Sequence, residues 1–193
     1  MHNFSDTVAR RTPARRLDLN AILGISTPSS EVMLNKAGLT NTMELLRHEA
    51  MVTSITIPHA LARLQNTRHW GIKQLRLAHR MIFEPIYDWA GEIRTVDIQK
   101  QGRRFADKDR IEFLVENAFR KFYSVHSQQR NLTDNLRRMS TQQISCAFAN
   151  LYNDLNLVPP FREGNGRTIK TILTAMVRQA DLIPIPDHNA AMM

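Results

Sequence analysis

The stretch Pro159-Pro160-Phe161-Arg162-Glu163-Gly164-Asn165-Gly166-Arg167 is the most informative part of the sequence. Its two prolines predict the end of a helix, because proline lacks an amide hydrogen and restricts the residue before it. Its glycines permit tight backbone geometry where the next helix begins. Exposed amides at such a helix start, with the helix dipole behind them, are suited to binding phosphate. The alternative is a plain turn between two helices.

Charged side chains surround this predicted turn. Arg162, Arg167 and Lys170 would add positive charge to the phosphate site. Glu163 is the one carboxylate in the loop, and it could hold a divalent cation against bound phosphates. The residues therefore favour a cradle for phosphate and Mg²⁺.

Apolar residues on both sides of the turn recur at helical spacing, which predicts helices there. The members of the three strongest stripes are Ile111, Leu114, Val115, Ala118, Phe119 and Phe122; Ile144, Ala147, Phe148, Leu151 and Leu155; and Ile169, Ile172, Leu173, Met176 and Val177. Further helices are expected over 42–53, with Thr42 as N-cap, over 59–64, opened by Pro58, and over 72–82. Cys146 adjoins the second stripe and is expected to be buried.

Residues 92–105 have a different pattern. Apolar and polar residues alternate from Ile93 to Gln99, and Gly102 follows within a polar turn. This pattern predicts a short β-hairpin. The fold class expected from the residues is therefore a mostly helical domain with one small β-element.

Composition limits the classes of protein that remain. A chain of 193 residues has room for one domain of 31–193 and a basic, flexible arm of 1–30. Its apolar runs are too short to cross a membrane. One cysteine excludes an intrachain disulfide and a multi-cysteine zinc site, so a cytoplasmic protein without a membrane partner is expected. The net charge of +8 and pI of about 10.2 are typical of a protein with an anionic partner, and also of one whose basic residues are spread over solvated helix faces.

The run from Phe161 to Arg167 resembles the signature of the Fic family, His-x-Phe-x-(Asp/Glu)-Gly-Asn-Gly-Arg-x-x-Arg. The segment from Tyr87 to Arg94 resembles the family's Tyr-x-Trp-Ala-Gly-x-x-Arg, and His79 matches a histidine often found before it. Residues 102–105 resemble the family's flap hairpin, and 35–39 the opening of its N-terminal region. The resemblance covers about residues 31–183.

This resemblance implies an all-α Fic-type domain with a short β-hairpin flap, which binds ATP and Mg²⁺ and transfers AMP to a hydroxyl group of a target protein. It also implies roles for individual residues. Gly164, Asn165 and Gly166 would form the anion hole, while Arg162, Arg167 and Lys170 would contact the nucleotide. Glu163 would hold Mg²⁺, and Arg103, Arg104 and Phe105 would dock the target protein.

The sequence departs from the family pattern in several places. Pro159 occupies the position of the catalytic histidine, and proline cannot accept a proton. Lys170 replaces the final arginine and loses its bidentate fork. The chain ends sooner after the motif than is common in the family. The family's inhibitory string Ser/Thr-x-x-x-Glu-Gly/Asn does not occur, so restraint would either come from a small antitoxin-like partner or be unnecessary.

Three functions are consistent with these observations. The first is a Fic-type protein adenylyltransferase that is weak or inactive because Pro159 replaces the general base. The second is a non-catalytic module that binds nucleotide or another protein. The third is nucleic-acid binding through the arginines, which ranks last because no nucleic-acid motif occurs in the sequence.

Overall fold

The computed structural model describes residues 32–100, 103–126, 136 and 138–179. Helices dominate this part of the chain, as the sequence predicts. They are α2 (Thr42–Leu64), α3 (Ile72–Phe83), α4 (Ile111–His126), α6 (Thr141–Asn156) and α7 (Asn165–Gln179), with a 3-10 turn, η1, at Lys108–Arg110. In the described part, no helix is both long and apolar enough to span a bilayer.

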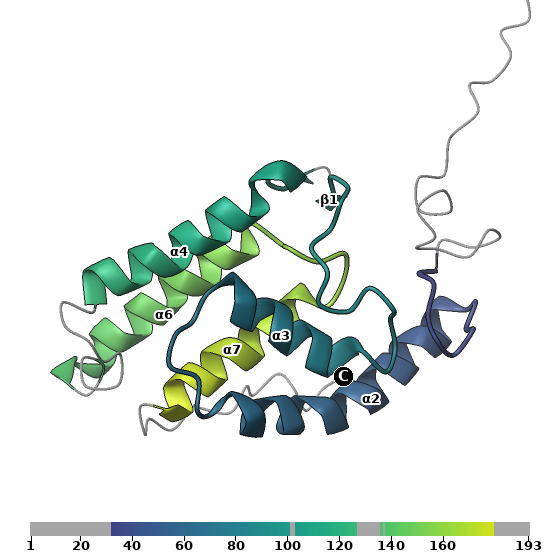
Figure 1. The fold of residues 1–193 in the computed structure, drawn as a ribbon, viewed down its shortest axis with the longest axis horizontal. Coiled ribbons are helices and arrows are strands. Elements are labelled where there is room, and N and C mark those ends of the chain that lie inside the picture. The colour runs from purple at the N-terminus through teal and green to yellow at the C-terminus, as the bar shows by residue number, and fades with distance from the viewer. Residues whose placement is uncertain (1–31, 101–102, 127–135, 137, 180–193) are drawn as a thin grey trace, which may run out of the picture.

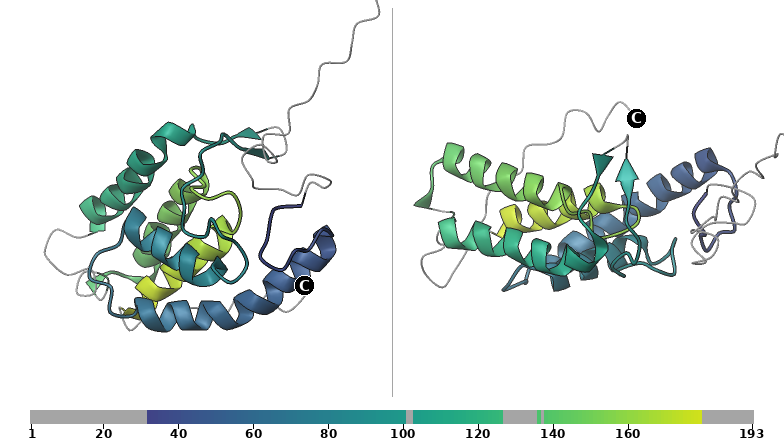
Figure 2. Two further views of the ribbon diagram at one scale, coloured as in Figure 1. Left: turned by 45° about the vertical axis from the view of Figure 1, so that its right-hand side comes forward. Right: turned by 90° about the horizontal axis from the view of Figure 1, so that it is seen from above.

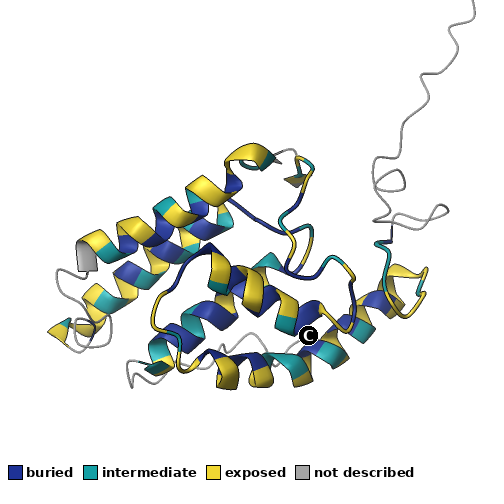
Figure 3. Cartoon of the chain, viewed as in Figure 1, coloured by how far each residue is buried: buried dark blue, intermediate teal, exposed yellow. Residues whose placement is uncertain are grey.

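Helix α7, which begins within the motif, lies among the other helices (Figure 1). It contacts α2, α3 and α6, and α4 packs along α6. The pairing of α4 with α6 is also visible from the directions drawn in Figure 2. Buried positions line the inward faces of these helices (Figure 3). The motif loop therefore leads into a helix that packs against three others.

Two clusters of buried side chains make up the core. The larger one joins the end of α2 to α3, α4, α6 and α7 and includes Trp70 and Phe161. The smaller one joins α2 to the end of α3 and the residues after it, and includes Phe83 and Tyr87. Ile57 of α2 packs against both clusters. The motif loop contributes to the larger cluster, and its neighbour Phe83 to the smaller.

Helix α2 differs from the prediction at both of its expected boundaries. Asn41, not Thr42, is the N-cap, and its side chain accepts hydrogen bonds from the amides of Met43 and Glu44. Pro58 lies inside α2 and does not open a second helix. The buried side of the helix continues beyond it with Ala60, Leu61 and Leu64, and this packing offsets the backbone hydrogen bond that proline removes.

The β-element is shorter than the alternating pattern suggested. Strands β1 (Gln99–Lys100) and β2 (Arg103–Arg104) pair antiparallel, with Gln99 opposite Arg104. Residues 93–98 form no strand, because the backbone amide of Arg94 donates to the Pro160 carbonyl instead of to a neighbouring strand. The prediction for Cys146 was wrong: it lies on the exposed side of α6.

Candidate functional site

Arg94 anchors the beginning of the motif. Its backbone amide donates to the Pro160 carbonyl at 2.9 Å, and its Nε donates to the Pro159 carbonyl at 2.9 Å. The same guanidinium reaches the carbonyls of Val96 and Ala106, on either side of the hairpin. One buried side chain thus joins the hairpin to the first motif position. The sequence pointed to Arg94 only through the family resemblance.

Asn165 closes the motif loop. Its Oδ1 accepts from the Phe161 amide and its Nδ2 donates to the Phe161 carbonyl, both at 2.8 Å. The side chain expected in the anion hole therefore binds the loop's own backbone. It fixes the path of the chain into α7. The side chain would therefore support an anion site by holding the loop backbone in place, and not by contacting the anion.

The two glycines of the loop stand in different surroundings. Gly164 has φ of +75°, and a Cβ there would lie 2.4 Å from the Phe83 ring, so the backbone conformation and the packing both require glycine. Around Gly166, nothing lies within 4 Å of a Cβ. Nothing in the packing explains glycine at 166.

The start of α7 offers unused hydrogen-bond donors. The first helical amide bond runs from Thr168 to the Gly164 carbonyl at 3.0 Å. Within the described residues, the amides of Asn165, Gly166 and Arg167 have no acceptor. The Gly164 amide donates to Oε1 of Glu163 at 2.9 Å. Three donors and the positive end of the helix dipole therefore lie at the start of α7, where the position of Gly166 is open.

Arg167 is held by a carboxylate that the sequence analysis missed. Its Nη2 lies 2.5 Å from Oε2 of Glu49 on α2, and 3.9 Å from Oε1 of Glu163. Glu49 is only 3% exposed and also accepts from the Tyr87 hydroxyl. The only sign of this role in the sequence was that Glu49 lies four residues after Leu45, which places an acidic residue on the apolar side of the helix. Arg167 therefore ties α7 to α2.

His79 lies directly beneath the loop. Its Nδ1 accepts from the Gly91 amide at 2.9 Å, so in the neutral ring Nε2 carries the hydrogen and donates to the Glu163 carbonyl at 3.0 Å. Burial lowers the pKa of His79 to about 4, against the opposing effect of the Glu163 carbonyl. Both ring nitrogens are occupied, so His79 supports the loop and is not free to accept a proton.

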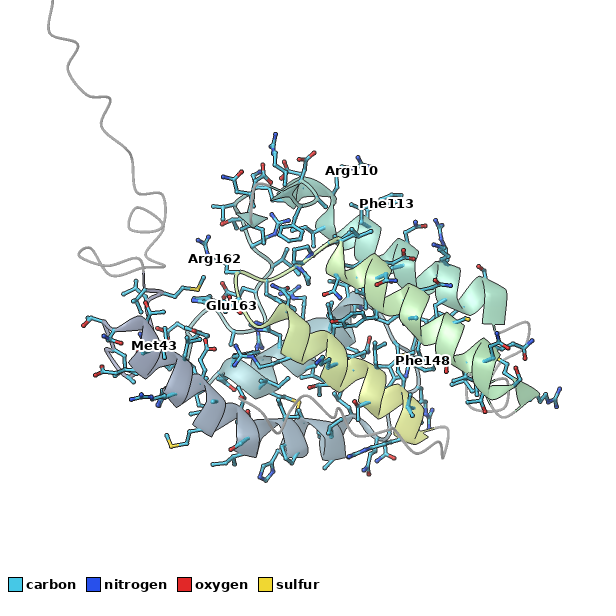
Figure 4. All side chains as sticks on the ribbon, turned by 180° about the vertical axis from the view of Figure 1, so that it is seen from behind. Met43, Arg110, Phe113, Phe148, Arg162 and Glu163 are labelled. Atoms are coloured by element: carbon cyan, nitrogen blue, oxygen red, sulfur yellow. The ribbon has the colours of Figure 1, made fainter. Side chains whose placement is uncertain are left out.

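The remaining predicted residues surround this centre. Arg162 and Glu163 project from the loop at one end of α7 (Figure 4). Burial, followed by the charge of nearby Arg94, lowers the pKa of Arg162. Lys170 is exposed on α7. Arg104 is exposed 4.0 Å from Asp97, Phe105 is half-buried, and the side chain of Arg103 lies outside the described residues.

The described residues contain no group of three or more His, Cys, Asp or Glu side chains placed to bind a metal. A cation at the loop would depend on the exposed carboxylate of Glu163 and on oxygens brought by a ligand. This arrangement fits Mg²⁺, which usually keeps several waters and takes one or two carboxylates together with phosphate oxygens.

A sequence model of the Fic/DOC family matches residues 70–177, which include α3, the hairpin and the motif. The chain belongs to the Fic/DOC family. Among curated relatives of this Fic domain, protein adenylyltransferase VbhT of Bartonella schoenbuchensis is 29% identical over 153 residues. The alignment covers 79% of the chain but 30% of VbhT. Probable protein adenylyltransferase y4lH of Sinorhizobium fredii is 28% identical over 79% of the chain and 74% of y4lH.

Solved structures of Fic domains share the fold. The N-terminal Fic domain of a Bep effector protein from Bartonella sp. AR 15-3 superposes with a TM-score of 0.68, covering 88% of this chain and 80% of that one at 18% identity. BepC of Bartonella tribocorum, solved with bound AMPPNP, gives 0.66 at 17% identity over 80% of this chain and 76% of BepC. The likeness establishes the helical arrangement.

Proposed function

We propose that this chain binds ATP or a related nucleotide at residues 162–170, on the scaffold of a protein adenylyltransferase that acts in the cytoplasm. The observation that carries the proposal is the group of three amides at the start of α7 that find no acceptor in the described part of the chain, beside the open Gly166. A helix start of this kind binds phosphate through its donors and dipole. Support comes from VbhT, which is named a protein adenylyltransferase, and from BepC, which was solved with AMPPNP.

Each residue of the loop has a distinct part in this proposal. The amides of Asn165, Gly166 and Arg167 donate to phosphate oxygens, and Gly166 leaves space for the phosphates to approach. Arg162 and Lys170 supply positive charge. Arg167 shares its charge with Glu49, so its main part is to hold the amides in place. Glu163 holds Mg²⁺, which neutralises the charge of the phosphates when it is bound.

Transfer of AMP requires a base for the target's hydroxyl proton, and Pro159 has no group that accepts one. A positioned general base contributes typically about 10² to 10⁴ in rate. His79 does not replace it, because both of its nitrogens are hydrogen-bonded and its pKa is lowered to about 4. The proposed activity of this chain is therefore weak or absent, although its nucleotide site is retained.

The hairpin would bind the target protein. Strands β1 and β2 pair with each other, and each has one outer edge that pairs with no strand in the described part of the chain. Arg104 of β2 is exposed. An extended target segment could add to such an edge through main-chain hydrogen bonds. Arg103, Arg104 and Phe105 are the residues proposed for this contact. A small antitoxin-like protein remains the proposed source of any restraint.

Thermal unfolding with and without Mg-ATP tests nucleotide binding. A ligand present at 100 times its Kd stabilises the folded state by about 2.7 kcal/mol, so the melting temperature should rise. Gly166→Glu should abolish this rise, because its carboxylate would lie over the three amides. The variant should still fold, since position 166 is open and an acidic residue suits a helix start.

Two further variants complete this experiment. Glu163→Ala should reduce the rise in melting temperature caused by Mg-ATP. The smaller rise caused by ATP without Mg²⁺ should remain in this variant. Glu112→Ala, at an exposed position on α4, removes the same charge elsewhere and should leave the shift unchanged. A rise in melting temperature that survives in Gly166→Glu would contradict the proposed site.

A non-catalytic interaction module is the second candidate. It is favoured by the engagement of the Asn165 and Arg167 side chains within the protein itself. This candidate predicts no thermal shift with any nucleotide, whereas the first predicts a shift that depends on Gly166. The same unfolding experiment therefore separates the two.

A further inference from the structure

The outer side of α3 carries a cationic hollow that the motif does not use. Lys73, Arg76, Leu77 and Arg80 line a hollow of about 240 Å³. All four residues are exposed, and exposed positions of α3 face the viewer in Figure 3. Lys73, Arg76 and Arg80 follow one another at helical spacing, so three positive charges fall on one side of the helix over about 10 Å.

The two arginines in this hollow are oriented by backbone carbonyls. Nε of Arg76 donates to the Gly91 carbonyl at 3.0 Å, and Nε of Arg80 approaches the Ala90 carbonyl at 3.5 Å. Among the residues that the structure describes, no carboxylate forms an ion pair with Lys73, Arg76 or Arg80. The terminal nitrogens of both guanidinium groups therefore keep their donors for an outside acceptor, in the planar fork that matches phosphate.

We infer that this hollow is a second anion site, which binds the phosphate chain of a small oligophosphate. Its size and its row of three cations fit two or three linked phosphate groups. No aromatic side chain lines it, so it lacks the stacking surface with which single-stranded nucleic acid is usually held. A short phosphate chain is for this reason favoured over a polynucleotide.

The hollow is connected to the motif loop through Gly91 and His79. Gly91 offers its carbonyl to Arg76 and donates its amide hydrogen to Nδ1 of His79, whose Nε2 donates to the Glu163 carbonyl. Gly91 has φ of +82°, and a Cβ there would lie 2.9 Å from the Arg76 carbonyl oxygen. Two hydrogen bonds therefore separate Arg76 from His79, and a ligand held by Arg76 would lie one further bond away.

Titration calorimetry of the full chain with inorganic triphosphate tests this site. The Gly166→Glu background is used because it removes the proposed nucleotide site, so the result does not depend on that proposal. Triphosphate should still bind there, and Arg76→Gln with Arg80→Gln should weaken binding about tenfold or more. Lys73→Gln, which removes no side-chain hydrogen bond or ion pair within the described residues, should weaken it by a smaller factor.

A matched control removes equal charge elsewhere. Arg47→Gln with Arg63→Gln, both exposed on α2, should leave triphosphate binding unchanged. Equal weakening by the two double variants would overturn the site, because binding would then follow net charge alone. Absence of triphosphate binding in Gly166→Glu would also overturn it. So would tighter binding of a single-stranded oligonucleotide than of triphosphate through the same residues.

Discussion

Arg167 illustrates how a motif residue can serve the fold as well as a ligand. Its guanidinium pairs with buried Glu49, which also accepts from the Tyr87 hydroxyl. Removing Arg167 would leave the buried Glu49 carboxylate with only the Tyr87 hydroxyl as a partner, which is destabilising because the charge loses its compensation. The partners are 118 residues apart in the chain, so the spacing of residues around the motif carried no sign of this pairing.

His79 should make stability depend on pH. The unfolded chain takes up a proton at this residue below about pH 6.5, whereas the folded chain does so only near pH 4, because burial lowers the pKa. The free energy of unfolding should therefore fall as pH drops from 6.5 to 4, by about 3 kcal/mol. Urea unfolding across this range measures the change.

His79→Asn is the test of this assignment, since it removes the titrating group. The variant should show a shallower dependence on pH than the wild type between 6.5 and 4. His59→Gln, at an exposed position on α2, should retain the wild-type dependence. An unchanged slope in His79→Asn would show that another group is responsible.

The two motif glycines should respond differently to alanine. Gly164→Ala places a Cβ against Phe83 at a positive φ. The strained φ alone should lower the free energy of unfolding by about 1–3 kcal/mol, and the clash with Phe83 should lower it further. Gly166→Ala meets no atom within 4 Å and should change it by less than about 1 kcal/mol. Chemical denaturation of both variants measures the contrast. Equal destabilisation would contradict the loop geometry.

At the scale of helices, Pro58 offers a test of how packing overrides local preference. Proline in a helix interior removes a backbone hydrogen bond, yet α2 continues past it. Pro58→Ala should therefore raise the free energy of unfolding, by on the order of 2 kcal/mol. Pro85→Ala, at an exposed position outside the helices, should give no such gain. Destabilisation by Pro58→Ala would mean that the packing of α2 needs the proline.

Element types could be read from the sequence more reliably than element ends. The stripes over 111–122, 144–155 and 169–177 fall in α4, α6 and α7, because a periodic apolar face is what packing selects. Cys146 was misplaced because it adjoins such a stripe without lying on its inner side. The hairpin was overextended because Arg94 draws its backbone to the motif loop.

The candidate site was predictable only in part. The Phe161–Arg167 run indicated a phosphate loop, and the open Gly166 agrees with that interpretation. The roles of Glu49, Arg94 and His79 could not be derived from spacing, since each acts through a contact between distant segments. Their contributions depend on the packing of α2, α3 and α7 around the loop.

At the scale of the whole molecule, the two core clusters should unfold together. Helices α2, α3 and α7 contact one another, and Ile57 packs against both clusters. Each of the chain's two tryptophans reports on one cluster, Trp70 on the larger and Trp89 on the smaller. The variants Trp70→Phe and Trp89→Phe each keep one tryptophan. During chemical denaturation of either variant, the fluorescence of that tryptophan and the helical circular dichroism should change with the same midpoint. Separate midpoints in either variant would indicate that the clusters unfold independently.

The net charge of +8 now has two local interpretations. Arg162, Arg167 and Lys170 surround the proposed nucleotide loop, and Lys73, Arg76 and Arg80 line the hollow on α3. Both places offer donors to phosphate groups. The arginines of residues 1–30 lie outside the described residues and have no structural account.

The central claim is that a nucleotide site persists while the base at position 159 is missing. Transfer of label from ATP carrying a labelled α-phosphate to proteins of a cell extract tests it most directly, with wild type, Pro159→His and Pro159→Ala compared. The Arg94 contacts to this segment use backbone carbonyls, so they survive both substitutions. Pro159→His should raise transfer by about 10² to 10⁴ over the wild type, and Pro159→Ala should not. Robust transfer by the wild type, or no gain in a Pro159→His protein that binds ATP, would contradict the claim.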